Sequence, residues 1–429
     1  MDAAILTGSP SPALKGDIGV PGDKSMSHRA LILGGMASGE TRIRGLLEGD
    51  DVLHTADVVR ALGAEVERIG PGEWQVRGGE WSSPAAPVDC GNSGTGARLL
   101  MGAVAGCPIE VAFTGDTSLS RRPMARVLDP LRSMGANAEG STLPVTIRGG
   151  DLHGISFVNE KASAQVKSAI LLAGLRAMGE VEVIEPRASR DHTENMLRAF
   201  GCDVETDGEC IRLGERRVLT ATEVEIPGDP SSAAFPIVAA LIVPGSEIRV
   251  RNVMTNPLRT GLLKTLSEMG GNIQLEDHRT HGGEPVADII IRSSQLHGVE
   301  VPAERAPSMI DEYPMLAVAA AFADGRSVMH GLSELRVKES DRLAAIVAGL
   351  RACGVEARDE GDSLIVEGCG GPPPGSGSVV AHDDHRIAMS FLVMGLAARA
   401  PVSVDSADMI ATSFPDFVPL MRSLGASIR

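Results

Sequence analysis

No stretch of this 429-residue chain is apolar for the length of a membrane span, and the first twenty residues contain no continuous apolar core of the signal-peptide type. The six cysteines are dispersed without CxxC spacing, as is typical of reduced intracellular proteins. Positive charge is also limited, because 40 basic residues face 56 acidic ones. The net charge of −16 argues against nucleic acid or an anionic membrane as a partner. We therefore expect a soluble cytoplasmic enzyme or binding protein.

Several common catalytic and metal motifs are missing. The GDKS segment is not a Walker loop, because Asp23 stands where the glycine directly before the lysine should be. Neither a nucleophile elbow nor a strong Rossmann fingerprint occurs. His382 and His385 in HDDHR suggest a metal, but the other usual zinc signatures are lacking. We therefore expect no metal site.

The chain does contain one unit repeated six times. In each copy an amphipathic segment ends on a glycine that is followed by a short strand, as in RALGAEVE and RSLGASIR. The six glycines are Gly63, Gly135, Gly201, Gly270, Gly354 and Gly425. They lie roughly 70 residues apart, beyond the period of about 20 to 50 residues that solenoid repeats show. Each glycine is expected at a helix C-cap, so each copy is predicted to be a small βα module.

Each module opens with a polar cluster ahead of a nearly apolar run, and such a run predicts a buried helix. The clusters are GDKSMSHR, GNSGTG, SAQ, GDPSS, SMIDEYP and DDHR. Helix N-termini favour anions, so six of them packed around a common centre would form an anion-binding chamber. Simple N-capping would explain the Ser, Thr, Asp and Asn residues almost as well. The pattern leaves both interpretations open.

An internal duplication predicts the domain boundaries. The PGD turn with Gly22 reappears with Gly228, and the closing glycines of modules one and four are separated by nearly the same distance. Modules one to three should therefore form one domain and modules four to six another, with a boundary near Pro227. From the pattern alone, the first twenty residues could belong to either domain. The expected domains are 21–227, and 228–429 together with 1–20.

Cations near one module opening and near the expected start of another helix favour an anionic ligand. Lys24, Ser25 and Arg29 surround one helix start and could hold a phosphate or a carboxylate, although a capped helix with solvated cations is the alternative. Arg121 and Arg122 precede a proline at another expected helix start, where we expect at least one of them to be solvated.

Carboxylates accompany cations in the second half of the chain. In LRVKESDRL, Glu339 lies between Lys338 and Arg342 within one helical turn, either as an acid–base group or as part of an exposed ion-pair cluster. Asp311 in SMIDEYP is either a helix cap or a candidate general base. Arg386 starts an apolar helix and is well placed to bind an anion.

Taken together, the motifs resemble those of the enolpyruvylshikimate phosphate synthase family. They run in order over nearly the whole chain: GDKSMSHR, GNSGTGARL, RRPM, SAQVKSA, SRDHTE, PGDPSSAAF, DEYP, LRVKESDRL, DHRIAMS and SFPDF. The resemblance implies an α/β fold, a two-domain inside-out α/β barrel with three βαβαββ modules per domain. It implies that the N-terminal strand returns to the second domain, and that the active site lies in the cleft between the domains.

The resemblance also implies the reaction. The enolpyruvyl group of phosphoenolpyruvate would pass to the 5-hydroxyl of shikimate 3-phosphate through a tetrahedral intermediate, with release of phosphate. This is a transferase step of the shikimate pathway, which leads to chorismate and the aromatic amino acids. No metal or organic cofactor is implied, and we expect a cytoplasmic monomer whose partners are small molecules.

Site residues follow from the matching motifs. The expected catalytic residues are Lys24, Asp311 and Glu339. Shikimate 3-phosphate would be bound by Lys24, Ser25, Arg29, Ser163, Ala164, Gln165, Arg190, Asp311 and Lys338. Phosphoenolpyruvate would be bound by Lys24, Gly94, Arg122, Gln165, Arg342, His385 and Arg386. The two acids look like the base and the acid of the reaction, with Lys24 assisting proton transfer.

Three positions depart from the commonest family pattern. Glu334 stands where many members have asparagine, Ala164 where many have serine, and Thr412 where many have lysine. These departures resemble a divergent class that contains glyphosate-tolerant members. Tolerant members of that class have alanine at the position of Gly94, so the glycine here predicts inhibition by glyphosate.

Two other functions remain as alternatives. One is the sister enolpyruvyl transferase that acts on UDP-N-acetylglucosamine, although its catalytic-loop cysteine is absent from TGDTSLSRRPM. The other is a non-catalytic anion-binding scaffold, which would leave the carboxylates Asp311 and Glu339 unexplained.

Overall fold

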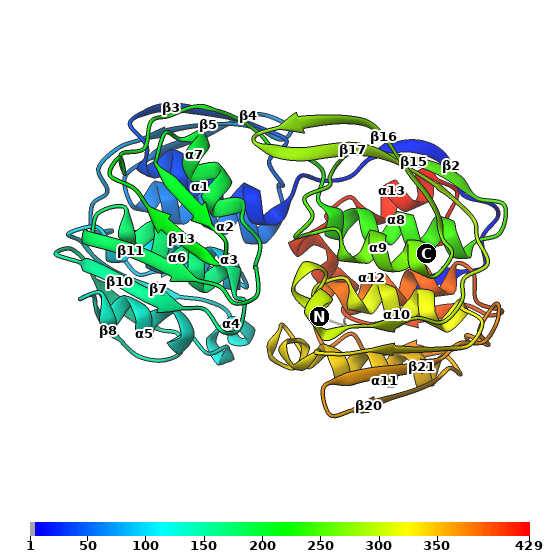
Figure 1. Cartoon of the computed structure of the whole chain (residues 1–429). Coiled ribbons are helices and arrows are strands. Elements are labelled where there is room, and N and C mark those ends of the chain that lie inside the picture. Colours follow the sequence, from blue (N-terminus) through cyan, green and yellow to red (C-terminus); the bar gives the residue numbers. More distant parts are fainter. Residues whose placement is uncertain (1–4) are drawn as a thin grey trace. The chain divides into compact units, whose positions relative to one another are not determined.

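The computed structural model describes residues 5–429, which form two compact units (Figure 1). The N-terminal unit consists of Gly22–Ile226 with His281–Glu284. The C-terminal unit consists of the described residues up to Pro21, Pro227–Thr280 and Pro285–Arg429. Residues 1–4 of the expected second domain lie outside the described residues. The segment His281–Glu284, which was expected in the second domain, clusters with the N-terminal unit because it pairs with side chains there.

Residues 5–429 build six four-stranded sheets, one for each module. Module two shows the pattern, in which β6 pairs parallel with β7, while β9 pairs antiparallel with β7 and with β8. Its elements are β6 (Val88–Asp89), α3 (Gly94–Ala105), β7 (Glu110–Thr114), α4 (Thr117–Arg121), α5 (Ala125–Ser133), β8 (Asn137–Glu139) and β9 (Val145–Arg148). A βαβαββ module of this kind confirms the expected fold class.

Two further modules complete the N-terminal unit. Module one comprises β14 (Glu223–Glu225), α1 (Lys24–Met36), β3 (Gly39–Arg44), α2 (Asp50–Ala61), β4 (Glu65–Gly70) and β5 (Glu73–Gly78). Module three comprises β10 (His153–Val158), α6 (Ala164–Gly174), β11 (Met178–Ile184), α7 (His192–Ala199), β12 (Val204–Asp207) and β13 (Cys210–Leu213). Module one therefore takes its first strand, β14, from the end of the unit's main segment.

The C-terminal unit takes two strands from the beginning of the chain. Module four comprises β2 (Lys15–Gly19), α8 (Pro230–Ile242), β15 (Glu247–Met254), α9 (Gly261–Glu268), β16 (Asn272–His281) and β17 (Glu284–Arg292). Module six comprises β22 (Ser378–Val379), α12 (His385–Gly395), β23 (Val402–Val404), the 3₁₀ helix η3 (Ala407–Thr412), α13 (Phe417–Ser423), β24 (Ser427–Ile428) and β1 (Leu6–Ser9). Within the first twenty residues, which the pattern could not assign, β2 thus belongs to module four and β1 to module six.

Module five contains the motifs with carboxylates. Its elements are β18 (Glu300–Val301), the 3₁₀ helix η1 (Ala303–Ser308), α10 (Tyr313–Phe322), β19 (Arg326–Met329), the 3₁₀ helix η2 (Ser333–Val337), α11 (Arg342–Ala352), β20 (Glu356–Glu360) and β21 (Ser363–Glu367). The short helix η1 leads into the segment with Asp311, and η2 leads into the segment with Lys338 and Glu339.

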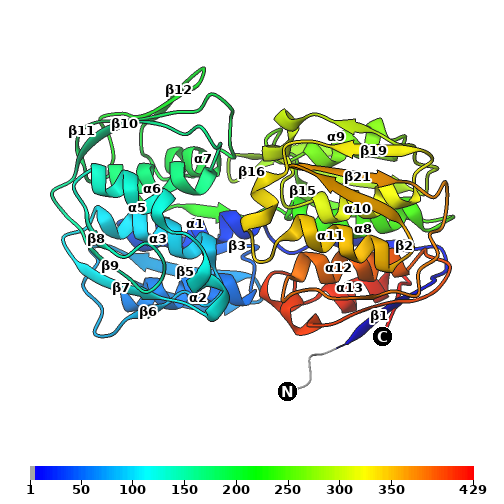
Figure 2. The same ribbon diagram turned by 90° about the horizontal axis from the view of Figure 1, so that it is seen from below.

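The apolar runs form the interior of each unit. Every residue of α8, α10 and α12 is buried, and these three helices contact one another. In the N-terminal unit α3 contacts both α1 and α6. Figure 2 shows the sheets of each unit on the outside of its helices, as the inside-out description requires. Among residues 5–429, no helix combines the length and the hydropathy that crossing a membrane would require.

The repeated glycines end the second helix of each module, as predicted. All six have positive φ, between 79° at Gly354 and 109° at Gly63, a region that favours glycine. In five modules an arginine three residues before the glycine donates its Nε to a carbonyl of the following strand segment. The five bonds join Arg60 to Val66, Arg132 to Ala138, Arg198 to Val204, Arg351 to Ala357 and Arg422 to Ile428. These arginines hold helix and strand together.

Candidate active site

The polar clusters at the module openings are helix caps in five of the six modules. In each, the side chain accepts a hydrogen bond from a backbone N–H two or three residues ahead. The capping residues are Asp23, Ser93, Ser163, Asp229 and Asp384. The capping interpretation therefore explains these residues. Anion binding must come from the cations beside the caps.

Arg29 is the most firmly held of these cations in the N-terminal unit. It is buried in α1 and donates from Nη1 to the carbonyl oxygen of Ser25, at 2.8 Å. Its Nε donates to Thr193 Oγ1 at 2.7 Å and its Nη2 to Ser168 Oγ at 2.8 Å. Because α1, α6 and α7 all contribute partners, the guanidinium is fixed before any ligand arrives.

Lys24 is the first residue of α1, and its Nζ donates to Asp51 Oδ2 at 3.0 Å. Behind it His28 is fully buried, with Nδ1 2.8 Å from Thr55 Oγ1 and Nε2 3.4 Å from Ser93 Oγ. Burial, together with the positive charges of Lys24 and Arg29, lowers the pKa of His28 to about 3. His28 is therefore a neutral residue that joins α1 to the start of α3.

Acid should destabilise the protein through His28. The unfolded chain binds a proton on this residue below its ordinary pKa of 6.5, whereas the fold excludes that proton down to about pH 3. The free energy of unfolding therefore decreases as the pH falls from 6.5 towards 3, and at pH 5 it is about 2 kcal/mol lower than at pH 7. In urea unfolding at pH 7 and pH 5, His28→Asn should remove this part of the loss. The exposed His278→Asn is the control, and equal losses in the His28 variant and the wild type would contradict the assignment.

Gly94, the first residue of α3, lies beside two guanidinium groups. A Cβ added to it would be 3.0 Å from Arg98 Nη1 and 3.1 Å from Arg122 Nη1. Arg122 donates from Nη2 to Asn92 Oδ1 at 2.6 Å and to Ser118 Oγ at 3.2 Å. The glycine therefore leaves open a small space between helix N-terminus and guanidinium, which suits an anion.

Gln165 is held between α3 and α6. Its Oε1 accepts a hydrogen bond from Arg98 Nη1 at 2.9 Å, and its Nε2 donates to Thr95 Oγ1 at 2.9 Å. Ser163 and Ala164 precede it as the N-cap and the first residue of α6. The role of Arg98 was not predicted, although its place one turn after Gly94 was a signal for it.

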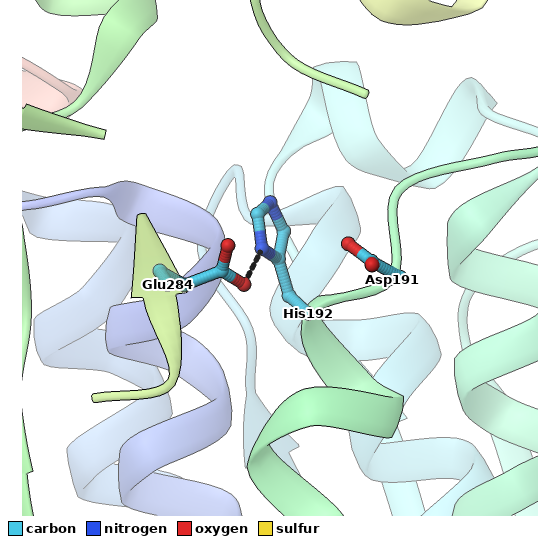
Figure 3. A group of neighbouring side chains, drawn as sticks. All are labelled: Asp191, His192 and Glu284. Carbon is cyan, nitrogen blue, oxygen red and sulfur yellow. Dashed lines mark hydrogen bonds and ion pairs between the residues drawn. The ribbon is translucent and has the colours of Figure 1, made fainter. Parts of the chain in front are cut away.

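Arg190 lies in the loop that leads into α7, next to the one group of potential metal ligands found among the described residues. That group is Asp191, His192 and Glu284, shown in Figure 3 with the imidazole between the two carboxylates. His192 Nδ1 is 2.9 Å from Glu284 Oε1, which also accepts a hydrogen bond from Asn195 at 3.2 Å. These hydrogen bonds account for the contact of His192 with Glu284, two of the three residues in the group. The group does not include the HDDHR histidines.

In the C-terminal unit Arg342 joins three carboxylates. It is the first residue of α11, is 1% exposed, and donates from Nε to Asp384 Oδ2 at 2.8 Å and from Nη1 to Asp311 Oδ1 at 3.2 Å. Its Nη2 pairs with Glu339. Burial alone would lower the pKa of Arg342, but the three carboxylates outweigh burial and raise it. Lys338 Nζ donates to Asp311 Oδ1 at 3.1 Å, so two cations share that oxygen.

Arg386 and His385 begin α12 beside this cluster. Arg386 Nη1 donates to the backbone oxygen of Asp311 at 3.3 Å. His385 Nδ1 lies 3.4 Å from the hydroxyl of Thr412, which donates to the carbonyl of Met409 at 2.7 Å. Glu334, another departure from the family pattern, lies in η2.

The predicted residues fall into two sets, one in each unit. The N-terminal unit contains Lys24, Ser25, Arg29, Gly94, Arg122, Ser163, Ala164, Gln165 and Arg190, and the C-terminal unit contains Asp311, Lys338, Glu339, Arg342, His385 and Arg386. Most are the first or second residue of a helix. The structure adds Asp51, Asn92 and Asp384 as partners of predicted cations. Sequence reasoning missed these three because each acts across the fold.

Helix-borne cations beside paired carboxylates, on two three-module units, are suited to a protein that binds small multiply charged anions and has acid–base groups beside them. A family model described as EPSP synthase (3-phosphoshikimate 1-carboxyvinyltransferase) matches residues 9–421. The chain belongs to this family of enolpyruvyl transferases.

Relatives and solved structures agree with this assignment. The chain is 57% identical over 440 residues to the 3-phosphoshikimate 1-carboxyvinyltransferase of Caulobacter vibrioides, with 100% of this chain and 99% of the relative covered. It is 59% identical over 437 residues to that of Parvibaculum lavamentivorans, with 99% and 97% covered. EPSP synthase from Acinetobacter baumannii has a TM-score of 0.88, 44% identity and 99% of each chain covered. The enolpyruvyl transferase NikO from Streptomyces tendae, at 19% identity, a TM-score of 0.79, and 100% and 99% covered, shares the fold.

Proposed function

We propose that this chain transfers the enolpyruvyl group of phosphoenolpyruvate to the 5-hydroxyl of shikimate 3-phosphate and releases phosphate, with the roles assigned below. One cluster of contacts supports these roles. Arg342 and Lys338 both contact Asp311, and Arg342 also contacts Glu339. A scaffold that only bound anions would not need two carboxylates beside its cations.

Shikimate 3-phosphate takes the cations of α1 and the segment before α7 in this proposal. Arg29 and Arg190 bind its phosphate, because a guanidinium can donate two hydrogen bonds to phosphate oxygens. The hydroxyl groups of Ser25 and Ser163 and the amide of Gln165 contact the same substrate. Lys24, Ala164, Asp311 and Lys338 complete this set.

Phosphoenolpyruvate is bound by a second set of cations, of which Lys24 is shared with shikimate 3-phosphate. Arg122 and Lys24 act beside Gly94, where the start of α3 presents backbone N–H groups. Arg342, Arg386, His385 and Gln165 complete this set. The two substrates carry about six negative charges when each phosphate counts as nearly −2. Seven positive charges oppose them, from Lys24, Arg29, Arg122, Arg190, Lys338, Arg342 and Arg386.

The acids perform the proton transfers. Asp311, ionised beside two cations, takes the proton of the 5-hydroxyl as its oxygen bonds to C2 of phosphoenolpyruvate. Glu339 gives a proton to the methylene carbon, because a bound anion that competes for Arg342 favours the protonated form of Glu339. The tetrahedral adduct then loses phosphate from C2 while the ionised Glu339 takes a proton back from the methyl carbon, which restores the double bond. The departing phosphate carries off the proton that Asp311 took. Lys24 stabilises the charge that develops.

A phosphate-release assay tests the function. With shikimate 3-phosphate and phosphoenolpyruvate together, the wild-type chain should release phosphate continuously, and omission of either substrate should abolish release. A parallel reaction replaces shikimate 3-phosphate by UDP-N-acetylglucosamine and should release none. Release only with the nucleotide sugar would assign the chain to the sister reaction, and no release with either acceptor would leave a binding protein.

Glyphosate is proposed as an inhibitor that competes for the space beside Gly94. Gly94→Ala places a Cβ at 3.0 and 3.1 Å from two guanidinium nitrogens, so these side chains must move into the site. An overpacking cost of about 1–3 kcal/mol raises the glyphosate concentration for half-inhibition about 5- to 150-fold, and the KM for phosphoenolpyruvate less. Gly19→Ala, where a Cβ meets nothing within 4 Å, is the control. An inhibition curve that does not move in Gly94→Ala would rule this out.

We also propose that the chain works in the reducing cytoplasm. All six cysteines are free thiols, four of them buried, and disulfides are the usual adaptation to oxidising compartments. Burial raises the pKa of Cys90 to about 12 and that of Cys202 to about 11, so these thiols are unreactive.

A further inference from the structure

A buried ion cluster lies in module three, outside the residues assigned to the reaction. Lys167, on α6, places its Nζ 2.7 Å from Glu185 Oε2 and 2.7 Å from Glu194 Oε1. The side chains of these three residues are 1% and 3% exposed. Burial lowers the pKa of Lys167, but the two glutamates outweigh burial and raise it, so the lysine is charged. Such a cluster is not needed for stability, because apolar residues of similar volume often stabilise a core as well.

Glu185 of the ion cluster is linked by hydrogen bonds to the start of α6. Glu185 Oε1 accepts a hydrogen bond from Asn159 Nδ2 at 2.6 Å. The same amide donates to the carbonyl of Ser163 at 3.1 Å, while Asn159 Oδ1 accepts from the backbone N–H of Ser163 at 3.2 Å. Glu185 therefore fixes, through Asn159, the residue that caps α6.

The ion cluster also holds the residue before Arg190. Ser189 donates its backbone N–H to Glu185 Oε2 at 3.1 Å and its hydroxyl to Glu185 Oε1 at 2.6 Å. Its carbonyl accepts from Lys167 Nζ at 3.4 Å. All three polar groups of Ser189 are thus bound by the ion cluster. On the far side of Arg190, His192 is held by Glu284 (Figure 3).

The sequence neighbours of the ion cluster hold Arg29. Ser168 follows Lys167 on α6 and Thr193 precedes Glu194 on α7, and both accept hydrogen bonds from the Arg29 guanidinium. Their hydroxyls also lie 2.7 Å from each other. A displacement of Lys167 or Glu194 would therefore be transmitted to Arg29.

We propose that the Lys167–Glu185–Glu194 cluster is a positioning device for shikimate 3-phosphate, which sets Ser163, Arg190 and Arg29 in the geometry that binds its phosphate. Glu185 is the key positioning residue, because it accepts from Lys167, Asn159 and both donors of Ser189. The inference rests on the proposed assignment of Ser163, Arg190 and Arg29 to this substrate.

Glu185→Gln tests the inference, because it keeps the shape but replaces one acceptor oxygen by an amino group that cannot accept. The Kd for shikimate 3-phosphate, measured by calorimetry, should rise about tenfold or more, whereas the KM for phosphoenolpyruvate should change less than twofold. Leu172→Ala is the control for stability, because it removes buried volume from the same helix without touching the ion cluster. It should lower Tm and leave the Kd unchanged.

A triple variant separates positioning from stability. Lys167→Met, Glu185→Gln and Glu194→Gln together remove all three charges, so Tm should recover toward the wild-type value while the Kd stays raised. Recovery of the Kd together with Tm would overturn the proposal, as would an equal rise in Kd in Leu172→Ala.

The variant Arg190→Gln distinguishes the assignment of the phosphate site from the positioning role of Glu185. It should raise the Kd for shikimate 3-phosphate at least as much as Glu185→Gln does. If it does so while Glu185→Gln has no effect, the site assignment stands and the positioning role is wrong. If Arg190→Gln leaves the Kd unchanged, the site assignment fails and the inference fails with it.

Discussion

Glu339→Gln should lower kcat about 10²- to 10⁴-fold while shikimate 3-phosphate still binds. The amide keeps the size of the side chain and can still accept from Arg342, but it cannot give a proton to the methylene carbon or take one back. Single-turnover kinetics and calorimetry with shikimate 3-phosphate should show a lost chemical step and a Kd within a fewfold of the wild-type value.

The control for this variant is Glu360→Gln, which removes a carboxylate paired with Arg358 on the surface of the same unit. It should leave kcat unchanged. Full activity of Glu339→Gln would remove Glu339 from the catalytic set. A loss of activity that came entirely from weaker substrate binding would make it a binding residue.

Arg342→Met should destabilise the C-terminal unit by about 3–5 kcal/mol, the range for removal of one partner from a buried ion pair. Three carboxylates share this guanidinium, and Asp384 is fully buried with it. Methionine fills much of the volume but leaves these charges without their shared cation. Differential scanning calorimetry should show a transition at a clearly lower temperature, and activity should fall as well.

Arg358→Met is the matched control, because Arg358 pairs with two glutamates on the exposed side of the same unit. Its transition temperature should stay near that of the wild type, since surface ion pairs contribute little. A second variant, Arg342→Met with Asp384→Asn, should recover part of the loss. If Arg342→Met were as stable as the control, the cluster would have no structural role.

Much of the fold could be predicted from local patterns. Six glycines after amphipathic segments located the ends of helices, and six apolar runs located the buried ones, because both signals depend on neighbours in sequence. The sheets to which β1 and β2 belong could not be predicted from such local patterns, since β1 pairs with β23 near the other end of the chain and β2 pairs with β15 near its middle. The hairpin turn His281–Glu284 clusters with the N-terminal unit through His192 and Glu225, which lie far from it in the sequence.

The candidate site was predicted to a similar extent. Residues at helix starts, such as Lys24 and Arg386, stand in motifs that can be read directly. Their partners cannot be predicted from these motifs, because Asp51 and the backbone oxygen of Asp311 come from distant parts of the sequence. The fourth opening, GDPSS, showed no cation in sequence. In the structure Arg259, from the loop after β15, donates to the capping Asp229 at 3.1 Å.

The positions of β1 and β2 in the sequence constrain the order in which the two units can fold. The segment Gly22–Ile226 contains every strand of its three sheets, so those modules can form while the rest of the chain is still being synthesised. Strand β1 leaves the ribosome before the other described strands, but its partners among residues 5–429 are β23 and β24, which leave it much later. Its unpaired edge and apolar residues must therefore persist through nearly all of translation. Strand β1 completes the sheet of module six, so a chain cut short before β24 lacks a finished C-terminal unit.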